Sequence, residues 1–256
     1  MKNNRLLLII GAIISIALIA AIFIVYNDKR MQVNEVSDKQ QETPIENEES
    51  VTIEKETPKT EPPVEPTEQP DANGYLPNQT LPKEPTYIND ILLANKVYPL
   101  PPTFAPGQNA EAGQALEKML VAAKQQGFDL VAFSGYRSYE YQETLYNNYV
   151  KRDGQAAADR YSARPGYSEH QTGLAFDIGE RGHEDVWLTE AFGETPAGQW
   201  LFAHAQDYGF ILRFPQNKEQ ITGYMYESWH YRYVGVEVAK EIKQQNSTLE
   251  EYLGVK

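Results

Sequence analysis

The sequence predicts an α+β domain with a small, mainly antiparallel sheet and flanking helices, preceded by a transmembrane helix and a disordered stalk. Three observations support this prediction. The 256-residue chain contains one long uncharged apolar run, then an acidic stretch rich in proline, and it carries 27 of its 29 aromatic residues from Tyr75 onward. In that aromatic part, helix and short-strand patterns are mixed in an order typical of α+β proteins.

Residues 6–26 form the apolar run, and we predict that they are a transmembrane helix. The run has 21 residues and no charge, and a helix of this length spans about 30 Å, the thickness of one hydrocarbon core. Lys2 and Arg5 precede it, so residues 1–26 should be a cytoplasmic tip and a single-pass anchor. The alternative is a cleaved signal peptide, but no clear Ala-x-Ala site follows the run.

Residues 27–74 are predicted to be a disordered stalk. They contain 13 acidic and 5 basic residues, six prolines and no aromatic residue, and such a segment cannot bury enough apolar surface to offset its ordering entropy. Its net charge of −8 makes up most of the −13 of the whole chain. The charge is therefore mainly a property of the stalk, and we assign the folded domain to residues 75–256.

Two features of the composition exclude whole classes of protein. The chain has no cysteine, which excludes a disulfide scaffold, a thiolate metal site, a cysteine nucleophile and a lipid-modified N-terminal cysteine. Its 36 acidic against 23 basic residues also argue against nucleic acid as a partner, because phosphate binding requires a basic face.

The domain should open with an extended segment, a helix and a strand. Repeated proline predicts that residues 91–106 are extended. Apolar residues at helical spacing predict a helix over 112–123, with Gly127 as its left-handed cap. A strand should follow at 128–133, where apolar residues lead into a polar turn.

A second helix should begin after Ser138, because serine is a preferred N-cap residue. It should carry Tyr141, Leu145 and Tyr149 along one face, and a short helix is expected over 155–161. The later elements follow from similar signals. They are a strand in the second half of 167–179, a helix from Thr195 and Pro196 to Gly209, strands at 210–214 and 229–234, and a helix over 236–245.

Candidate catalytic residues lie in two short segments. His170 and Asp177 are seven residues apart, and Gly173 between them permits a sharp turn. His230 lies in the other segment, three residues after Glu227. Two imidazoles and one carboxylate suit catalytic zinc and leave a fourth position open for water. Glu227, which is not a ligand in this scheme, is placed to be the general base.

This assignment requires a particular backbone shape, and other interpretations stay open. A regular strand would put Glu227 and His230 on opposite faces, so a bend or bulge must separate them. An isolated histidine is also a common core or surface residue. Other catalytic motifs are absent from the sequence: there is no HExxH helix and no Ser-x-x-Lys, and His170 occupies the place of the second glycine of a nucleophile elbow.

At these residues the chain resembles a known family. The segments SGYRSYEYQ at 134–142, SEHQTGLAFD at 168–177 and ESWHYRYVG at 227–235 resemble motifs of the VanY-type D-alanyl-D-alanine carboxypeptidases, which are zinc metallopeptidases. The resemblance implies a Hedgehog/D,D-peptidase-like fold. It also implies a zinc ion bound by His170, Asp177 and His230, with Glu227 as general base.

The resemblance further implies that Arg137 is a catalytic residue that contacts the substrate, either its terminal carboxylate or the developing oxyanion, and that Ser168 and Gln142 line the same substrate-binding pocket. A guanidinium fork suits either task of Arg137. The alternatives are structural. Arg137 would then form a salt bridge, Ser168 would cap a turn, and Gln142 would be an exposed helix residue.

The implied activity is removal of the terminal D-alanine from peptidoglycan stem peptides. An L,D-carboxypeptidase acting on tetrapeptide stems and a peptidoglycan endopeptidase are the nearer alternatives, and a non-catalytic wall-binding module is the alternative of another class. The expected partners are the stem peptides and, through the N-terminal helix, the cell membrane. We expect a monomer whose catalytic domain lies outside the membrane and faces the cell wall.

Overall fold

The computed structural model describes residues 70–255 of the chain. The predicted membrane helix at 6–26 and nearly all of the predicted stalk lie outside these residues, so the anchor and the extracellular location stay predictions. Within residues 70–255, no helix is long and apolar enough to cross a membrane.

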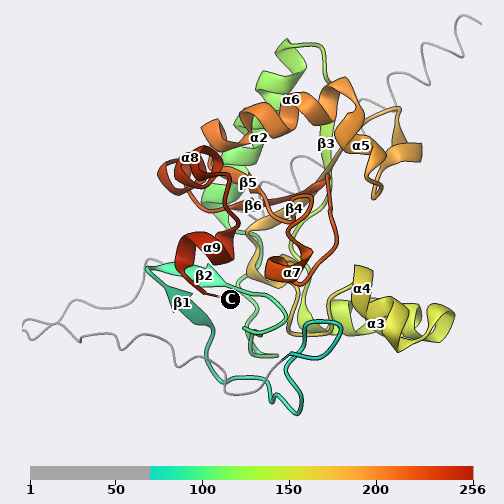
Figure 1. Ribbon diagram of the computed structural model, residues 1–256. Helices are drawn as coiled ribbons and strands as arrows, with labels where there is room; N and C mark the ends of the chain where they lie inside the picture. Colours follow the sequence, from blue (N-terminus) through green and yellow to red (C-terminus); the bar gives the residue numbers. More distant parts are fainter. Residues whose placement is uncertain (1–69, 256) are drawn as a thin grey trace, which may run out of the picture. The chain divides into compact units, whose positions relative to one another are not determined.

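The described chain is an α+β domain, as predicted (Figure 1). Its strands are β1 (Thr86–Ile88), β2 (Ile91–Leu93), β3 (Leu130–Ser134), β4 (Ala175–Glu180), β5 (Phe210–Leu212) and β6 (His230–Tyr233). Its α-helices are α2 (Ala110–Gln125), α3 (Tyr139–Asp153), α4 (Gln155–Tyr161), α5 (Ala191–Glu194), α6 (Pro196–His204), α7 (Glu219–Thr222), α8 (Val236–Gln245) and α9 (Leu249–Leu253). Short 3₁₀ helices are η1 (Glu169–Thr172), η2 (Glu184–Val186) and η3 (Ala205–Tyr208).

A four-stranded antiparallel sheet lies at the centre, in the order β3-β4-β6-β5, and β1 and β2 form a separate antiparallel hairpin. Successive side chains of a strand point to opposite faces. Phe176 and Ile178 of β4 therefore lie on one face of the sheet, whereas Asp177 lies on the other. One face of the sheet is therefore apolar, and the other carries the polar residues of the candidate site.

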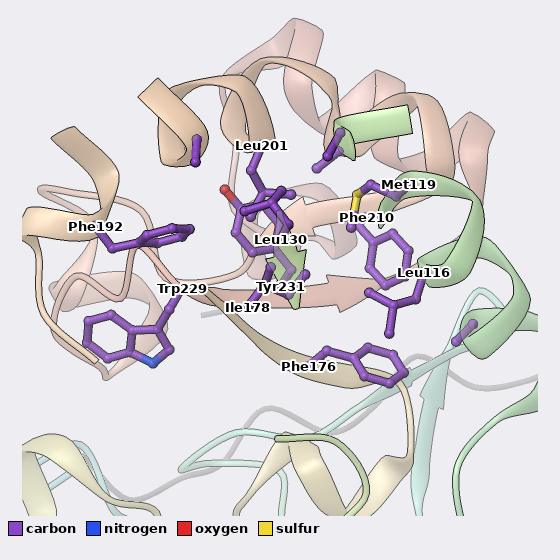
Figure 2. Close-up of a cluster of buried hydrophobic side chains, with 14 residues drawn as sticks. Leu116, Met119, Leu130, Phe176, Ile178, Phe192, Leu201, Phe210, Trp229 and Tyr231 are labelled. Atoms are coloured by element: carbon purple, nitrogen blue, oxygen red, sulfur yellow. The ribbon is translucent and has the colours of Figure 1, made fainter. Parts of the chain in front are cut away.

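The apolar face packs against α2 and α6, and it forms the main hydrophobic core (Figure 2). The core contains Leu116 and Met119 from α2, Leu201 from α6, and Phe176, Ile178, Phe210 and Tyr231 from the sheet. Burying side chains of this size contributes about 1.5–3 kcal/mol each. This face therefore supplies the stability, while the opposite face carries Asp177, His230 and Arg232.

Helix starts follow the local signals that the sequence contains. The Ser138 side chain accepts a hydrogen bond from the Tyr141 amide and caps α3, and Thr195 caps α6 in the same way. On α3, however, the buried residues are Gln142 and Tyr146, and Tyr141 is 63% exposed. The side chains on the predicted face, Tyr141, Leu145 and Tyr149, line an open cavity instead.

Several short elements differ from the predictions. The segment 91–106, expected to be only extended, begins with the paired strand β2. Helix α6 ends at His204, and η3 rather than α-helix continues to Gly209. Six short elements were not predicted from the sequence, because three to five residues are too few for a clear periodicity. They are β1, η1, η2, α5, α7 and α9.

Lys96 holds the first described residues against the domain. Its Nζ donates hydrogen bonds to the carbonyl oxygens of Asn73, at 2.9 Å, and Asp159, at 2.8 Å. The same Nζ lies over the rings of Tyr75 and Tyr224. The side chain is buried, and this burial lowers the pKa of Lys96 to about 8. Residues around Asn73, which we assigned to the stalk, thus contact the folded domain.

This lysine gives a pH-dependent contribution to stability. The unfolded chain keeps a lysine protonated up to about pH 10.4, whereas the folded chain releases the Lys96 proton above about pH 8. Raising the pH between these values therefore stabilises the fold. We expect the free energy of unfolding, measured by urea denaturation, to rise in the wild type relative to Lys96→Met by about 1 kcal/mol per pH unit in this window. Equal pH slopes for the two proteins would contradict the prediction.

Candidate active site

Strand register brings Asp177 and His230 together. Asp177 on β4 is paired directly with His230 on β6, and directly paired residues of antiparallel strands point to the same face. The Asp177 Oδ1 atom lies 3.1 Å from His230 Nδ1. Residues 53 positions apart in the sequence therefore meet because the sheet places them opposite each other.

His170 reaches the same point from η1. Gly173 ends this short helix with φ +71°, and a Cβ atom there would lie 2.0 Å from the carbonyl oxygen of Gly107. Only glycine fits this turn, as predicted. The turn leads into β4, so His170 Nε2 lies 3.2 Å from Asp177 Oδ2, while His170 Nδ1 lies 2.8 Å from the carbonyl oxygen of Gly135.

The three side chains fit a tetrahedral metal ion. Possible ligand atoms of His170, Asp177 and His230 all lie within 4.8 Å of one another, and all three residues are buried. The Asp177 carboxylate lies between the two imidazoles, with Oδ1 3.1 Å from His230 Nδ1 and Oδ2 3.2 Å from His170 Nε2. The donor set of two imidazoles and one carboxylate therefore suits zinc, as predicted.

Glu227 lies beside this group, and the backbone has the predicted bend. The His230 amide donates a hydrogen bond to the Glu227 carbonyl at 3.2 Å, which closes a turn immediately before β6. Glu227 Oε2 thereby comes within 3.7 Å of His230 Nδ1. Burial raises the pKa of Glu227 to about 7, and Asp177 adds to this effect while His230 opposes it. A carboxylate with this pKa is suited to exchange protons near neutral pH.

Arg137 and Ser168 also lie in the site. Arg137 Nη2 is 3.9 Å from Asp177 Oδ2 and donates a hydrogen bond to Ser134 Oγ at 3.1 Å. Ser168 lies at the start of η1, and its side chain makes no helix-capping hydrogen bond. Both residues line the cavity that contains the histidines.

Gln142 has a different place from the one predicted. It is 1% exposed and does not line the cavity. Its Oε1 accepts a hydrogen bond from Arg137 Nη1 at 2.7 Å, and its Nε2 donates to the carbonyl oxygen of Ala163 at 2.6 Å. Gln142 is therefore neither an exposed helix residue nor a lining residue. It holds the Arg137 guanidinium in place by accepting this hydrogen bond.

Glu169 is a residue of the site that was not predicted from the sequence. It is buried, and its Oε1 accepts hydrogen bonds from Arg213 Nε at 2.8 Å and Arg232 Nη1 at 2.7 Å. Its Oε2 lies 3.5 Å from His230 Nε2. Burial alone would raise the pKa of Glu169, but the two arginines hold it well below its ordinary value. Its position directly before His170 was the signal in the sequence that could have indicated a role in the site.

The cavity has a volume of about 1020 Å³. Pockets for drug-sized ligands measure about 300–1,000 Å³, so this cavity has room for a peptide of several residues. His170, Asp177, Glu227 and His230 lie on its wall, and Tyr141, Leu145 and Tyr149 of α3 line another part of the wall. Two histidines and an aspartate that suit a metal ion, beside a buried glutamate and an arginine, define the class of metal-dependent hydrolase sites.

Comparison with known proteins identifies the family. The sequence profile of the family described as VanY, D-alanyl-D-alanine carboxypeptidase, matches residues 107–236. This range is about half of the chain and includes all of the predicted site residues. The chain belongs to the VanY family of carboxypeptidases, which confirms the resemblance of the three sequence motifs.

Relatives of the chain include proteins of different specificity. The putative carboxypeptidase YodJ of Bacillus subtilis is 44% identical over 183 residues, which are 64% of this chain and 67% of that protein. The L,D-carboxypeptidase DacB of Streptococcus pneumoniae is 52% identical, with a TM-score of 0.59 over 65% of this chain and 87% of that one. A D,D-pentapeptidase VanY in complex with Zn(II) is 35% identical, with a TM-score of 0.55 over 63% of this chain and 97% of that one.

The position of Gln142 leads to a prediction about Arg137. Replacement of Gln142 by leucine leaves Arg137 Nη1 and the Ala163 carbonyl without their partner. We expect a loss of about 1–3 kcal/mol in the free energy of unfolding and, because Arg137 is no longer held, a fall of ten-fold or more in kcat/KM for peptide cleavage. Glu143→Ala, on the exposed side of the same helix, is the control. Loss of stability without loss of activity would show that Gln142 does not position Arg137.

Proposed function

We propose that this chain is a zinc-dependent D,D-carboxypeptidase that removes the terminal D-alanine from peptidoglycan stem peptides. The observation that carries the proposal is the group of His170, Asp177 and His230 in one cavity with Glu227 and Arg137. Family membership supports the reaction class, and the VanY relative in complex with Zn(II) supports the choice of metal.

Each residue has a role that follows from its position. His170, Asp177 and His230 would hold the zinc ion, which when bound makes water more acidic and polarises a carbonyl group. Glu227 accepts a proton from the attacking water and returns it to the amine of the leaving D-alanine. Its burial and near-neutral pKa favour both transfers.

Arg137 binds the negative charge of the substrate. Its guanidinium is fixed on one side by Gln142 and Ser134, and it lines the cavity near Asp177. A guanidinium group held in this way forms paired hydrogen bonds with a terminal carboxylate and also stabilises an oxyanion. Recognition of a free carboxylate at this point would explain cleavage at the end of a peptide rather than within it.

A second candidate function is L,D-carboxypeptidase activity on tetrapeptide stems. The observation that favours it is the 52% identity to DacB, which is described as an L,D-carboxypeptidase and is more similar to this chain than the VanY pentapeptidase is. The two activities use the same reaction and differ in the configuration of the residue before the scissile bond. An endopeptidase is disfavoured if Arg137 requires a free carboxylate.

A product assay separates these functions and tests the metal. We expect the purified protein to release D-alanine from a pentapeptide stem, and we expect a chelator to abolish the release and added zinc to restore it. Mass spectrometry of pentapeptide and tetrapeptide stems after incubation gives the products. Release from the tetrapeptide alone would favour the L,D activity, and cleavage within the stem would favour an endopeptidase. Wall binding with no released amino acid would contradict all three.

Replacement of Glu227 tests its role as the base. We expect Glu227→Gln to lower kcat by about 10²–10⁴-fold, because general base catalysis contributes an effect of this size, while the zinc content stays at the level of the wild type. Metal analysis of the purified variant provides the control, since Glu227 is not one of the three ligands. Unchanged turnover would exclude Glu227 as the base.

A further inference from the structure

Glu169 lies beside His230 and lines the same cavity, but it is neither a ligand nor the base of the proposed site. Its Oε1 is occupied by Arg213 and Arg232. Its Oε2 and His230 Nε2 are both fully buried and 3.5 Å apart, and neither has a hydrogen-bond partner among the described residues. A buried polar atom without a partner costs about 1–3 kcal/mol. A proton on His230 Nε2 that points to Glu169 Oε2 would satisfy both atoms.

We infer that Glu169 is a positioning residue that fixes the tautomer of His230. A neutral imidazole carries its proton on one nitrogen only. When the Glu169 carboxylate accepts the Nε2 proton of His230, Nδ1 is left without a proton, and Nδ1 is the atom that faces Asp177 Oδ1 at 3.1 Å. His230 therefore offers Nδ1 to the metal ion. The inference rests on the proposed metal site, and it is independent of which peptide is cleaved.

His170 has the opposite arrangement of its two ring nitrogens. Its Nδ1 donates to the carbonyl oxygen of Gly135 at 2.8 Å, which leaves Nε2 free to face Asp177 Oδ2 at 3.2 Å. The two histidines thus present different nitrogens to the metal, and each is fixed by a different acceptor. Such acceptors behind ligand histidines raise ligand basicity and set ring orientation.

The two arginines determine how Glu169 is oriented. Arg213 and Arg232 both donate to Oε1, so the carboxylate cannot rotate without losing two charge-assisted hydrogen bonds. Arg213 is in turn paired with Glu250 of α9, at 2.8 and 2.5 Å. Two arginines and two glutamates make the group electrically balanced. Oε2 is thereby directed at His230 and nowhere else.

Glu250 provides a matched control for Glu169. Both glutamates are buried and both bind Arg213, but among the hydrogen bonds and ion pairs of the described residues only Glu169 reaches His230. A purely structural role of the ion pairs predicts the same effect for Glu169→Gln and Glu250→Gln. A positioning role predicts that only Glu169→Gln changes metal binding.

Glutamine at position 169 has a specific consequence. Its amide oxygen must face the two arginines, because they can only donate, so its NH₂ group must face His230 Nε2. That nitrogen then becomes an acceptor, and the proton moves to Nδ1, the proposed ligand atom. We therefore expect zinc affinity, measured by competition with a chromogenic chelator, to fall by about 10–100-fold in Glu169→Gln and to stay within about two-fold of the wild type in Glu250→Gln.

Nitrogen-15 NMR of the imidazole groups gives a direct second measurement on the zinc-loaded wild type. The chain has four histidines, so their signals can be assigned with single variants. We expect His230 to be protonated at Nε2 and bound through Nδ1, and His170 to be protonated at Nδ1 and bound through Nε2. This measurement does not depend on whether Glu169→Gln folds.

The outcomes distinguish the inference from the proposed function. A wild type that binds no zinc overturns the metal site itself. A wild type that binds zinc, with equal affinities in the wild type and Glu169→Gln, overturns only the role of Glu169. Equal losses in Glu169→Gln and Glu250→Gln assign Glu169 a structural role, and a His230 bound through Nε2 also overturns the inference.

Discussion

The ion pairs of Glu169, Arg213, Arg232 and Glu250 are the interaction on which the rest of the domain depends. Both arginines are buried, and a buried charge is tolerated only when its partners are in place. Those partners come from distant parts of the chain: η1 supplies Glu169, α9 supplies Glu250, and Arg232 also donates to the carbonyl oxygen of Leu92 on β2. The hairpin, the sheet and the last helix must therefore assemble together.

The two faces of the sheet carry different groups of residues: the hydrophobic core lies on one face and the candidate metal-binding residues lie on the other. Phe176 and Ile178 secure β4 to the core on one face, and the strand between them turns Asp177 to the other face, opposite His230. A shift of one residue in this register would put Asp177 into the hydrophobic core. The apolar packing on one face thus also fixes the positions of Asp177 and His230 on the other.

Local signals in the sequence predicted the parts of this structure that depend on neighbouring residues. Ser138 and Thr195 cap helices, and Gly173 makes the predicted turn. The longer helices and the strands of the central sheet lie within a few residues of their predicted ranges. The roles of Glu169 and Gln142 were not predictable in this way, because their partners are defined only by the fold. Glu169 and Arg213 are 44 positions apart, and without the structure each resembles an ordinary surface charge.

Different contacts hold the two histidines and Arg137. The two histidines of the proposed metal site face acceptors within the protein: His170 Nδ1 lies 2.8 Å from the Gly135 carbonyl oxygen, and His230 Nε2 lies 3.5 Å from the Glu169 carboxylate. Arg137, in contrast, is held by Gln142, which is bonded to the carbonyl of Ala163 just after α4. A change in the segment between α4 and η1 would therefore reach Arg137 through Gln142. Arg137 also contacts two of the proposed metal ligands, because its amide donates to the His170 carbonyl oxygen and its guanidinium lies 3.9 Å from Asp177 Oδ2. Relatives described as D,D- and L,D-carboxypeptidases share the fold of this domain. Under the proposed function, the part of the cavity around Arg137 is therefore where the two specificities would differ.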